Sequence, residues 1–184
     1  MLLERSADAA MSTTSLVLTI LGPDRPGLVE SIARLVAEHQ GNWLESRMAH
    51  LAGQFAGILR VEVEADRADS LSQALAGLAK SGLETVIHPD PAIAIIADRP
   101  LVSLDLLGQD RPGIVRQISG VLAALGVNVE ELNTECRAAA ETGHPLFHAA
   151  AQLRLPPDVS EADLRVALEN VAADLMVEVK LAEK

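Results

Sequence analysis

Aromatic and basic residues are scarce in this sequence. Its 184 residues include two Phe, one Trp and no Tyr, and 15 Lys and Arg stand against 26 Asp and Glu, which makes the formal net charge −11. Proteins that bind single-stranded nucleic acids stack the bases on aromatic side chains, and phosphate backbones attract basic surfaces. The sequence therefore predicts a protein that makes no direct contact with nucleic acid.

Cysteine and long apolar runs are also nearly absent. The one cysteine, Cys136, excludes a disulfide within the chain and is typical of proteins of the reducing cytoplasm. We expect Cys136 to be a buried or half-buried strand residue in preference to a reactive thiol. No apolar run approaches the roughly 18–20 residues of a membrane span, so we expect a cytoplasmic protein with no membrane partner.

The sequence does contain an internal repeat. The nine residues Leu21–Val29 (LGPDRPGLV) recur as Leu107–Val115 (LGQDRPGIV), 86 positions later. Asn42 and Asn128 continue the same register downstream. An interval of nearly half the chain indicates a tandem duplication of a unit of about 80–90 residues, which is a domain-sized unit.

Hydrophobic periodicity gives both copies the same order of elements, β-α-β-β-α-β. In the first copy the strands are expected over residues 16–21, 43–51, 55–64 and 83–88. The helices are expected from the start signal Asp24-Arg25-Pro26 to the stop at Gly41, and over residues 70–80. In the second copy the elements are expected over residues 101–107, 114–125, 128–137, 147–155, 161–173 and 176–181. The interval lengthens to 92 after the hairpin, which places an insertion around 138–145, where a loop tolerates it. The pattern predicts two α+β domains of the ferredoxin-like βαββαβ type, each an antiparallel sheet with its helices on one face.

These elements set the expected domain boundaries. Residues 1–13 are expected to be a flexible N-terminal tail, residues 14–90 the first domain and residues 101–184 the second. The intervening linker, residues 91–100, holds the apolar run Ala92–Ala97, whereas flexible linkers are rich in Gly, Ser or charge. This run is expected either to add a strand to a sheet edge or to pack between the domains.

The duplicated turn is the best candidate for a binding site. A strand-to-helix turn ending in Pro-Gly exposes backbone N–H groups at a helix N-terminus, where the helix dipole favours an anion such as a carboxylate. Each copy also offers a carboxylate for an ammonium group, a guanidinium as an anion clamp, a glycine that allows close approach and an amide that donates and accepts. These are the pairs Asp24/Asp110, Arg25/Arg111, Gly27/Gly113 and Asn42/Asn128.

The same residues also have a purely structural interpretation. Asp24 and Asp110 then cap the two helices, and Pro26 and Pro112 stand near the first helical position, where a missing N–H costs nothing. The glycines and asparagines shape turns, and each Arg beside an Asp is a solvated surface pair. The residue pattern alone favours this interpretation, because helix caps are far commoner than ligand sites.

No set of catalytic or metal-binding residues stands out. The five histidines do not recur between the copies: His39, His50, His88, His144 and His148. His144 and His148 have a metal-like spacing only on a helix, and Pro145 between them predicts a hairpin instead. The chain contains no nucleophile elbow, P-loop or dinucleotide fingerprint. The sequence therefore predicts no catalysis, no metal and no cofactor.

A βαββαβ module that opens on Gly-x-Asp-Arg-Pro-Gly, with a Gly-Asn or Val-Asn step before its second strand, resembles the ACT domain. Two such modules in an acidic chain resemble the glycine cleavage system transcriptional repressor family, and the resemblance covers residues 16–181. It implies dimerising chains that bind small effectors, often amino acids, at interfaces between modules. Carried over by position, it marks as ligand-binding the residues Asp24, Arg25, Gly27, Leu28, Asn42, Asp110, Arg111, Gly113, Ile114 and Asn128.

The resemblance also implies a function. We expect a non-catalytic regulator of amino-acid (glycine) metabolism, a homodimer that senses a small amino acid such as glycine and acts through a DNA-binding regulator protein. Two alternatives are a structural interaction module without a ligand and a regulatory subunit of a metabolic enzyme. Pro23 in the first turn is replaced by Gln109 in the second, so the two sites are not expected to be identical.

Overall fold

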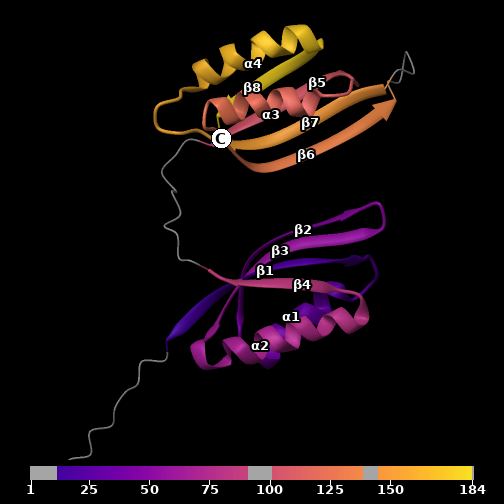
Figure 1. The fold of residues 1–184 in the computed structure, drawn as a ribbon, viewed down its shortest axis with the longest axis vertical. Coiled ribbons are helices and arrows are strands. Elements are labelled where there is room, and N and C mark those ends of the chain that lie inside the picture. Colours follow the sequence, from indigo (N-terminus) through magenta and orange to yellow (C-terminus); the bar gives the residue numbers. More distant parts are fainter. Residues whose placement is uncertain (1–11, 91–100, 139–144, 184) are drawn as a thin grey trace, which may run out of the picture. The chain divides into compact units, whose positions relative to one another are not determined.

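The computed structural model describes residues 12–90, 101–138 and 145–183. The chain divides into two compact units, Met1–Ala94 and Ile95–Lys184 (Figure 1), and each unit has its own hydrophobic core. The expected linker and residues 1–11 of the expected tail lie outside the described residues. The same holds for residues 139–144 of the expected hairpin insertion.

The first unit is a four-stranded antiparallel sheet with the strand order β2-β3-β1-β4. Both helices lie on one face of this sheet (Figure 1). Its elements are β1 (Thr13–Pro23), α1 (Leu28–Glu38), β2 (Asn42–Leu51), β3 (Gln54–Glu64), η1 (Ala65–Arg67), α2 (Ala68–Ala76), η2 (Gly77–Ser81) and β4 (Glu84–Pro89).

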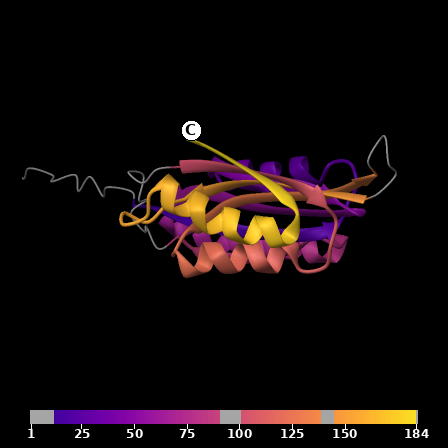
Figure 2. The same ribbon diagram turned by 90° about the horizontal axis from the view of Figure 1, so that it is seen from above.

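The second unit repeats this architecture, with the strand order β6-β7-β5-β8. Its two helices lie side by side on their sheet, as seen from above in Figure 2. Its elements are β5 (Leu101–Gln109), α3 (Ile114–Ala124), β6 (Asn128–Ala138), β7 (Pro145–Arg154), α4 (Glu161–Leu175) and β8 (Val177–Glu183). The predicted α+β class, with two ferredoxin-like βαββαβ domains, is confirmed.

Alternation along the strands decides which face of each sheet the helices cover. In β1, Leu16, Leu18 and Ile20 are buried, whereas Leu21 on the opposite face is 48% exposed. The first helix of each unit buries one stripe with a four-residue spacing, which is the period of a helix face. These stripes are Leu28, Ile32 and Val36 in α1, and Ile114, Ile118 and Leu122 in α3.

Several element boundaries differ from the sequence-based expectation. The helix expected over residues 70–80, for example, is α2 followed by the 3₁₀ segment η2. Gly22-Pro23 was expected to be a turn, yet both residues belong to β1, because they pair with Phe55 and Gln54 of the long strand β3. Met176 was expected to begin the last strand but instead ends α4 in the left-handed conformation, with φ 54°. In the described part of the chain, no helix has both the length and the apolarity to cross a membrane.

Candidate functional site

The first glycine of the duplicated motif is a contact point between elements, which the sequence analysis missed. A Cβ on Gly22 would lie 2.5 Å from the carbonyl oxygen of Gly82, and a Cβ on Gly108 would lie 2.7 Å from that of Met176. In both units the strand therefore passes against the end of the second helical segment at a distance that only glycine allows. The recurrence of this glycine in both copies of the motif was the sequence signal that could have predicted the contact.

The second glycine sets where each helix begins. Gly27 and Gly113 occupy the N-cap position in the left-handed conformation, with φ 88° and 95°, and a Cβ would meet no atom within 4 Å at either position. Glycine is therefore required here by conformation, because other residues are strained at such φ values. Since α1 begins only at Leu28, the expectation that Asp24 caps the helix and that Pro26 stands at its first position is wrong.

Asp24 instead anchors the turn to the β2–β3 hairpin. Its backbone N–H donates to the carbonyl oxygen of Gly53 at 2.9 Å, and its Oδ2 lies 3.7 Å from Nε2 of His50. In the second unit, the N–H of Asp110 donates to the carbonyl oxygen of Pro145 at 3.0 Å. The two aspartates thus join the first strand-to-helix turn to the neighbouring hairpin in the same way.

Cys136 occupies the position in β6 that His50 occupies in β2. It is exposed, so the expectation of a buried or half-buried side chain is wrong. The reason is that β6 is an edge strand, with β7 on one side only. Partial desolvation raises the pKa of the Cys136 thiol, and the nearby Asp110 carboxylate raises it further. Both effects disfavour the thiolate, the reactive form of cysteine.

The two arginines of the motif reach across to the end of the second helical segment in their own unit. Nη2 of Arg25 donates to the carbonyl oxygen of Ser81 at 3.5 Å, at the end of η2. Nη2 of Arg111 lies 3.6 Å from Sδ of Met176, which ends α4. A cation at this end of a helix complements the helix dipole, so these contacts give both guanidinium groups a structural role.

The N-termini of α1 and α3 have no side-chain cap. The first-turn N–H groups of a helix have no partner within the helix, and the turn residues before both helices are mostly exposed. The two termini differ in charge, because Glu30 in the first turn of α1 is replaced by Arg116 at the matching position of α3. The second unit is therefore the better site for an anion.

The structure does not bring the two asparagines to the turns of their own units. Asn42 begins β2 opposite Glu62, at the far end of the hairpin that Asp24 contacts. Ten residues of strand place the two about 30 Å apart. Asn128 has the same place in β6 and donates from Nδ2 to Oε1 of Glu130 at 2.8 Å, which lowers the pKa of the Glu130 carboxyl. Within one module, turn and asparagine do not form a single site.

His148 lies on the face of the second sheet opposite the helices. Its Nε2 is 2.8 Å from Oδ2 of Asp105, and its Nδ1 is 3.3 Å from Oε1 of Glu135. The hydrogen bond to Asp105, and then the one to Glu135, raise the pKa of His148 above its usual value of 6.5. His148 lies on strand β7, in agreement with the hairpin expected from Pro145. His144 lies outside the described residues.

This arrangement predicts a pH dependence for the stability of the second unit. Since the pKa of His148 is higher in the folded than in the unfolded state, its contribution is complete below about pH 6.5 and disappears as pH rises through the raised pKa. The difference in urea midpoint between the wild type and His148→Gln should therefore shrink from pH 5.5 to 8.5. Titration of the ring by NMR checks the cause: Asp105→Asn should lower the pKa, and a wild-type pKa at or below 6.5 would contradict the prediction.

Among the residues that the structure describes, no group of three or more His, Cys, Asp or Glu side chains is arranged to hold a metal ion. The site residues thus form two separate sets in each unit. One set is the uncapped helix N-terminus with its left-handed glycine, and the other is the start of the second strand. The aspartate and arginine of the turn contact the hairpin and the second helical segment.

Comparisons with known proteins agree with this fold. Residues 14–88 match the sequence model of the ACT domain family. A crystal structure of an unknown protein from Galdieria sulphuraria is 29% identical, with a TM-score of 0.84 over 94% of this chain and 99% of that one. A crystal structure of a proposed glycine cleavage system transcriptional repressor is 20% identical, with a TM-score of 0.69 over 94% of this chain and 98% of that one.

A sequence relative belongs to a longer protein. Phosphoserine phosphatase SerB2 of Mycobacterium tuberculosis is 23% identical over 173 residues, which cover 92% of this chain and 41% of the phosphatase. The first unit here matches the ACT family model, and the second has the same strand order and the same glycine-ended turn. The first unit is therefore an ACT domain, and the second unit repeats its fold.

Proposed function

We propose that this chain is a non-catalytic regulatory protein of amino-acid metabolism, with glycine metabolism as its field of action. The observation that carries the proposal is the match to the proposed glycine cleavage repressor, which extends over 94% of this chain and 98% of the other. The match therefore includes both βαββαβ units of this chain. The cytoplasm is the proposed location, where amino-acid pools are sensed.

The proposed effector is a small amino acid, glycine first, bound at the N-terminus of α3. Its carboxylate accepts hydrogen bonds from the first-turn N–H groups beside Gly113 and Ile114, and Arg116 adds positive charge there. Asn128 is too far along β6 to reach the same ligand. We therefore propose that the chain is a homodimer in which the asparagine of a second copy binds the ammonium group. In the first unit, Gly27 and Leu28 begin the corresponding helix, where Glu30 makes the site weaker, and Asn42 again comes from a second copy. Asp24 and Arg25 hold this turn in place.

The proposed partner is a DNA-binding regulator protein. A net charge of −11 disfavours contact with DNA and favours association with a basic surface of another protein. The effector then acts by population shift: it changes the affinity for the partner only as far as it prefers one arrangement of the modules over another.

One observation favours a second candidate function. The match to the phosphatase covers nearly all of this chain but only 41% of that enzyme, as expected if tandem ACT modules also serve as the regulatory part of metabolic enzymes. A chain of this kind would bind an enzyme in place of a transcription factor. A ligand-free interaction module is the outcome if no amino acid binds.

The charge difference between the two helix termini supplies a sharp test. Glycine, added to the wild type at a hundredfold excess over its dissociation constant, should raise the free energy of unfolding by about 2.7 kcal/mol. Arg116→Glu gives α3 the residue that α1 has at this position. It should weaken glycine binding about five- to thirtyfold, because losing a cation and gaining an anion each change the energy by about 0.5–1 kcal/mol. Urea denaturation with and without glycine measures the first effect, and isothermal titration calorimetry measures the second.

Lys180→Glu is the matched control, since it makes the same change of charge at an exposed position of β8. It should leave glycine binding unchanged. If glycine and the other nineteen amino acids all fail to bind the wild type, the sensing role is wrong and the ligand-free module replaces it. If the Arg116→Glu and Lys180→Glu variants bind glycine with equal affinity, the effector does not bind at the N-terminus of α3.

A further inference from the structure

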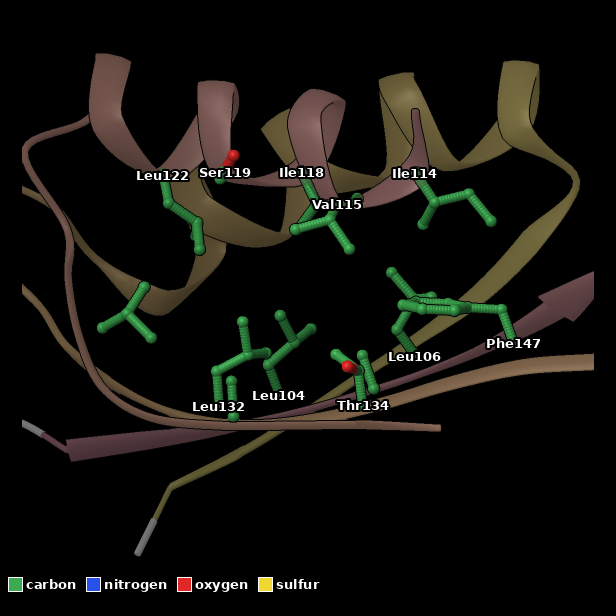
Figure 3. A pocket seen from close by; sticks show the side chains of 13 residues that line it. Leu104, Leu106, Ile114, Val115, Ile118, Ser119, Leu122, Leu132, Thr134 and Phe147 are labelled. Carbon is green, nitrogen blue, oxygen red and sulfur yellow. The ribbon is translucent and has the colours of Figure 1, made fainter. Parts of the chain in front are cut away.

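The second unit contains a cavity between α3 and the covered face of its sheet (Figure 3). Its volume is about 50 Å³. Side chains from α3 form one wall and side chains from β5, β6 and β7 the other. The lining residues that carry the argument are Ile118 and Ser119 from α3, Val129 and Thr134 from β6, and Ala149 and Ala151 from β7.

The repeat offers an explanation for this space, because three matching positions of the first unit hold much larger side chains. Trp43 stands where β6 has Val129, and Leu59 stands where β7 has Ala151. Trp43 packs against the first core, and Leu59 is fully buried in it. Replacing an indole and an isobutyl group by smaller groups leaves space that backbone relaxation closes only in part.

The strand backbones are equivalent in the two units, so this comparison is position by position. A bulge follows Trp43 in β2 and Val129 in β6 alike. Beyond the bulge, Met48 faces Gly57 across the strands, and a Cβ on Gly57 would lie 2.8 Å from Cγ of Met48.

The corresponding pair in the second unit is Thr134 and Ala149. The long side chain of Met48 requires glycine at the facing position, whereas the shorter Thr134 allows alanine there. The difference in side-chain volume between the units is therefore built into two facing strands. Four lining residues are larger than their counterparts, namely Ser119 for Ala33, Leu122 for Val36, Leu132 for Ser46 and Ala149 for Gly57. Of these, Leu132 is 49% exposed.

The chemistry of the lining limits what can bind. The lining includes no charged residue, and its hydroxyl groups belong to Ser119 and Thr134. The volume exceeds the roughly 15 Å³ that one water molecule needs, but it is about a third of the roughly 150 Å³ of an engineered apolar cavity that binds benzene. A small aliphatic group fits, an aromatic ring does not, and a charged group would lose its hydration without a partner.

We propose that this cavity is a second ligand site of the protein, for the branched aliphatic end of a small neutral molecule. The aliphatic group is buried between Ile118 and Ala151, and the polar end of the ligand stays at the mouth beside Ser119 and Thr134. The site is independent of the amino-acid site proposed for the turn. Binding in the cavity depends on burial of an apolar group, whereas binding at the turn depends on charge.

The test follows the methyl groups of the full-length protein by NMR while 2-methylpropan-1-ol is added as the probe. The resonances of Ile114 and Ile118 should shift and saturate, whereas Ile32, which has the place of Ile118 in the first unit, should not move. Benzyl alcohol, whose ring is too large, should leave all three unchanged. Wild-type resonances of Ile114 and Ile118 that do not shift with the branched alcohol would overturn the proposal.

Two variants then locate the site. Ala151→Leu puts the first unit's residue into the cavity and should weaken binding of the alcohol at least about tenfold, because the buried aliphatic contacts are lost. Ala150→Leu is the matched control, the same change on the adjacent residue, which faces the other side of the sheet. It should bind like the wild type. Equal binding by the two variants would overturn the proposal.

If Ala151→Leu does not fold, the triple variant Val129→Trp/Thr134→Met/Ala149→Gly fills the same space with the set of residues that packs in the first unit. It should show the same loss, and binding equal to the wild type would again count against the site. Arg116 lies outside the cavity lining, so the Arg116→Glu variant should bind the alcohol like the wild type. Weaker glycine binding therefore tests the site at the turn, and weaker alcohol binding tests the cavity, so the two proposals can fail separately.

Discussion

Leu59→Ala is expected to lower the free energy of unfolding of the first unit by about 3 kcal/mol, since truncating a buried leucine costs about 2.7–5 kcal/mol. Leu59 is fully buried in β3. The second unit has Ala151 at this position and is adapted to the smaller residue, but the first unit is not. Leu59 belongs to the core against which Trp43 and Met48 pack, so its truncation leaves a cavity in that core.

The chain has one tryptophan, Trp43, so its fluorescence during urea denaturation reports on the first unit. The expected result is a lower midpoint with an unchanged slope. Ile58→Ala is the control, because Ile58 is adjacent in β3 but 54% exposed; it should change the stability by well under the Leu59→Ala effect. Equal effects of the two substitutions would show that the burial of Leu59 does not stabilise the unit.

Gly108→Ala is expected to be the most damaging change to the duplicated motif. The new Cβ would lie 2.5 Å from Cγ1 of Val177 and 2.7 Å from the carbonyl oxygen of Met176. Because the second of these is backbone, β5 and β8 have to move apart where Gly108 pairs with Val177. Overpacking of this kind costs about 1–3 kcal/mol, and we expect the upper half of that range. For a domain of this size each kcal/mol lowers the melting temperature by about 4–8 °C.

Scanning calorimetry of the full chain measures this effect, and the Trp43 fluorescence transition should stay where it is. Gly120→Ala is the matched control in the same unit. Gly120 lies within α3, and a Cβ there meets no atom within 4 Å, so alanine should stabilise the unit by about 0.5–1 kcal/mol. If Gly108→Ala were neutral, the close approach of β5 to β8 would not be the reason for glycine at this position.

The repeat and its element order were predictable from the sequence, because both depend on local pattern. Alternating apolar residues in β1 and a four-residue stripe in α1 need no knowledge of distant neighbours. The insertion after β6 was predictable for the same reason, since it lengthens an interval between two recognisable motifs. Strand ends were less predictable: Gly22 and Pro23 look like a turn, but pairing with β3 extends the strand through them.

The candidate site shows where local pattern stops being sufficient. Asp24 precedes a helix in the sequence, which is typical of a cap, but the left-handed Gly27 moves the helix start and Asp24 contacts the hairpin instead. Asn42 and Asp24 are 18 positions apart and looked like parts of one site. An intervening helix and a long strand put them at opposite ends of the module.

The sequence by itself determined the duplicated turn, the order of the elements and the acidic charge, because each is carried by neighbouring residues or by composition. Only the tertiary structure decided that Gly108 touches the end of α4, that the arginines of the turn point there too, and that Val129 and Ala151 leave a space beneath α3. These features depend on side-chain volumes and contacts that meet across strands far apart in the chain. Their distances exist only once the sheet has formed.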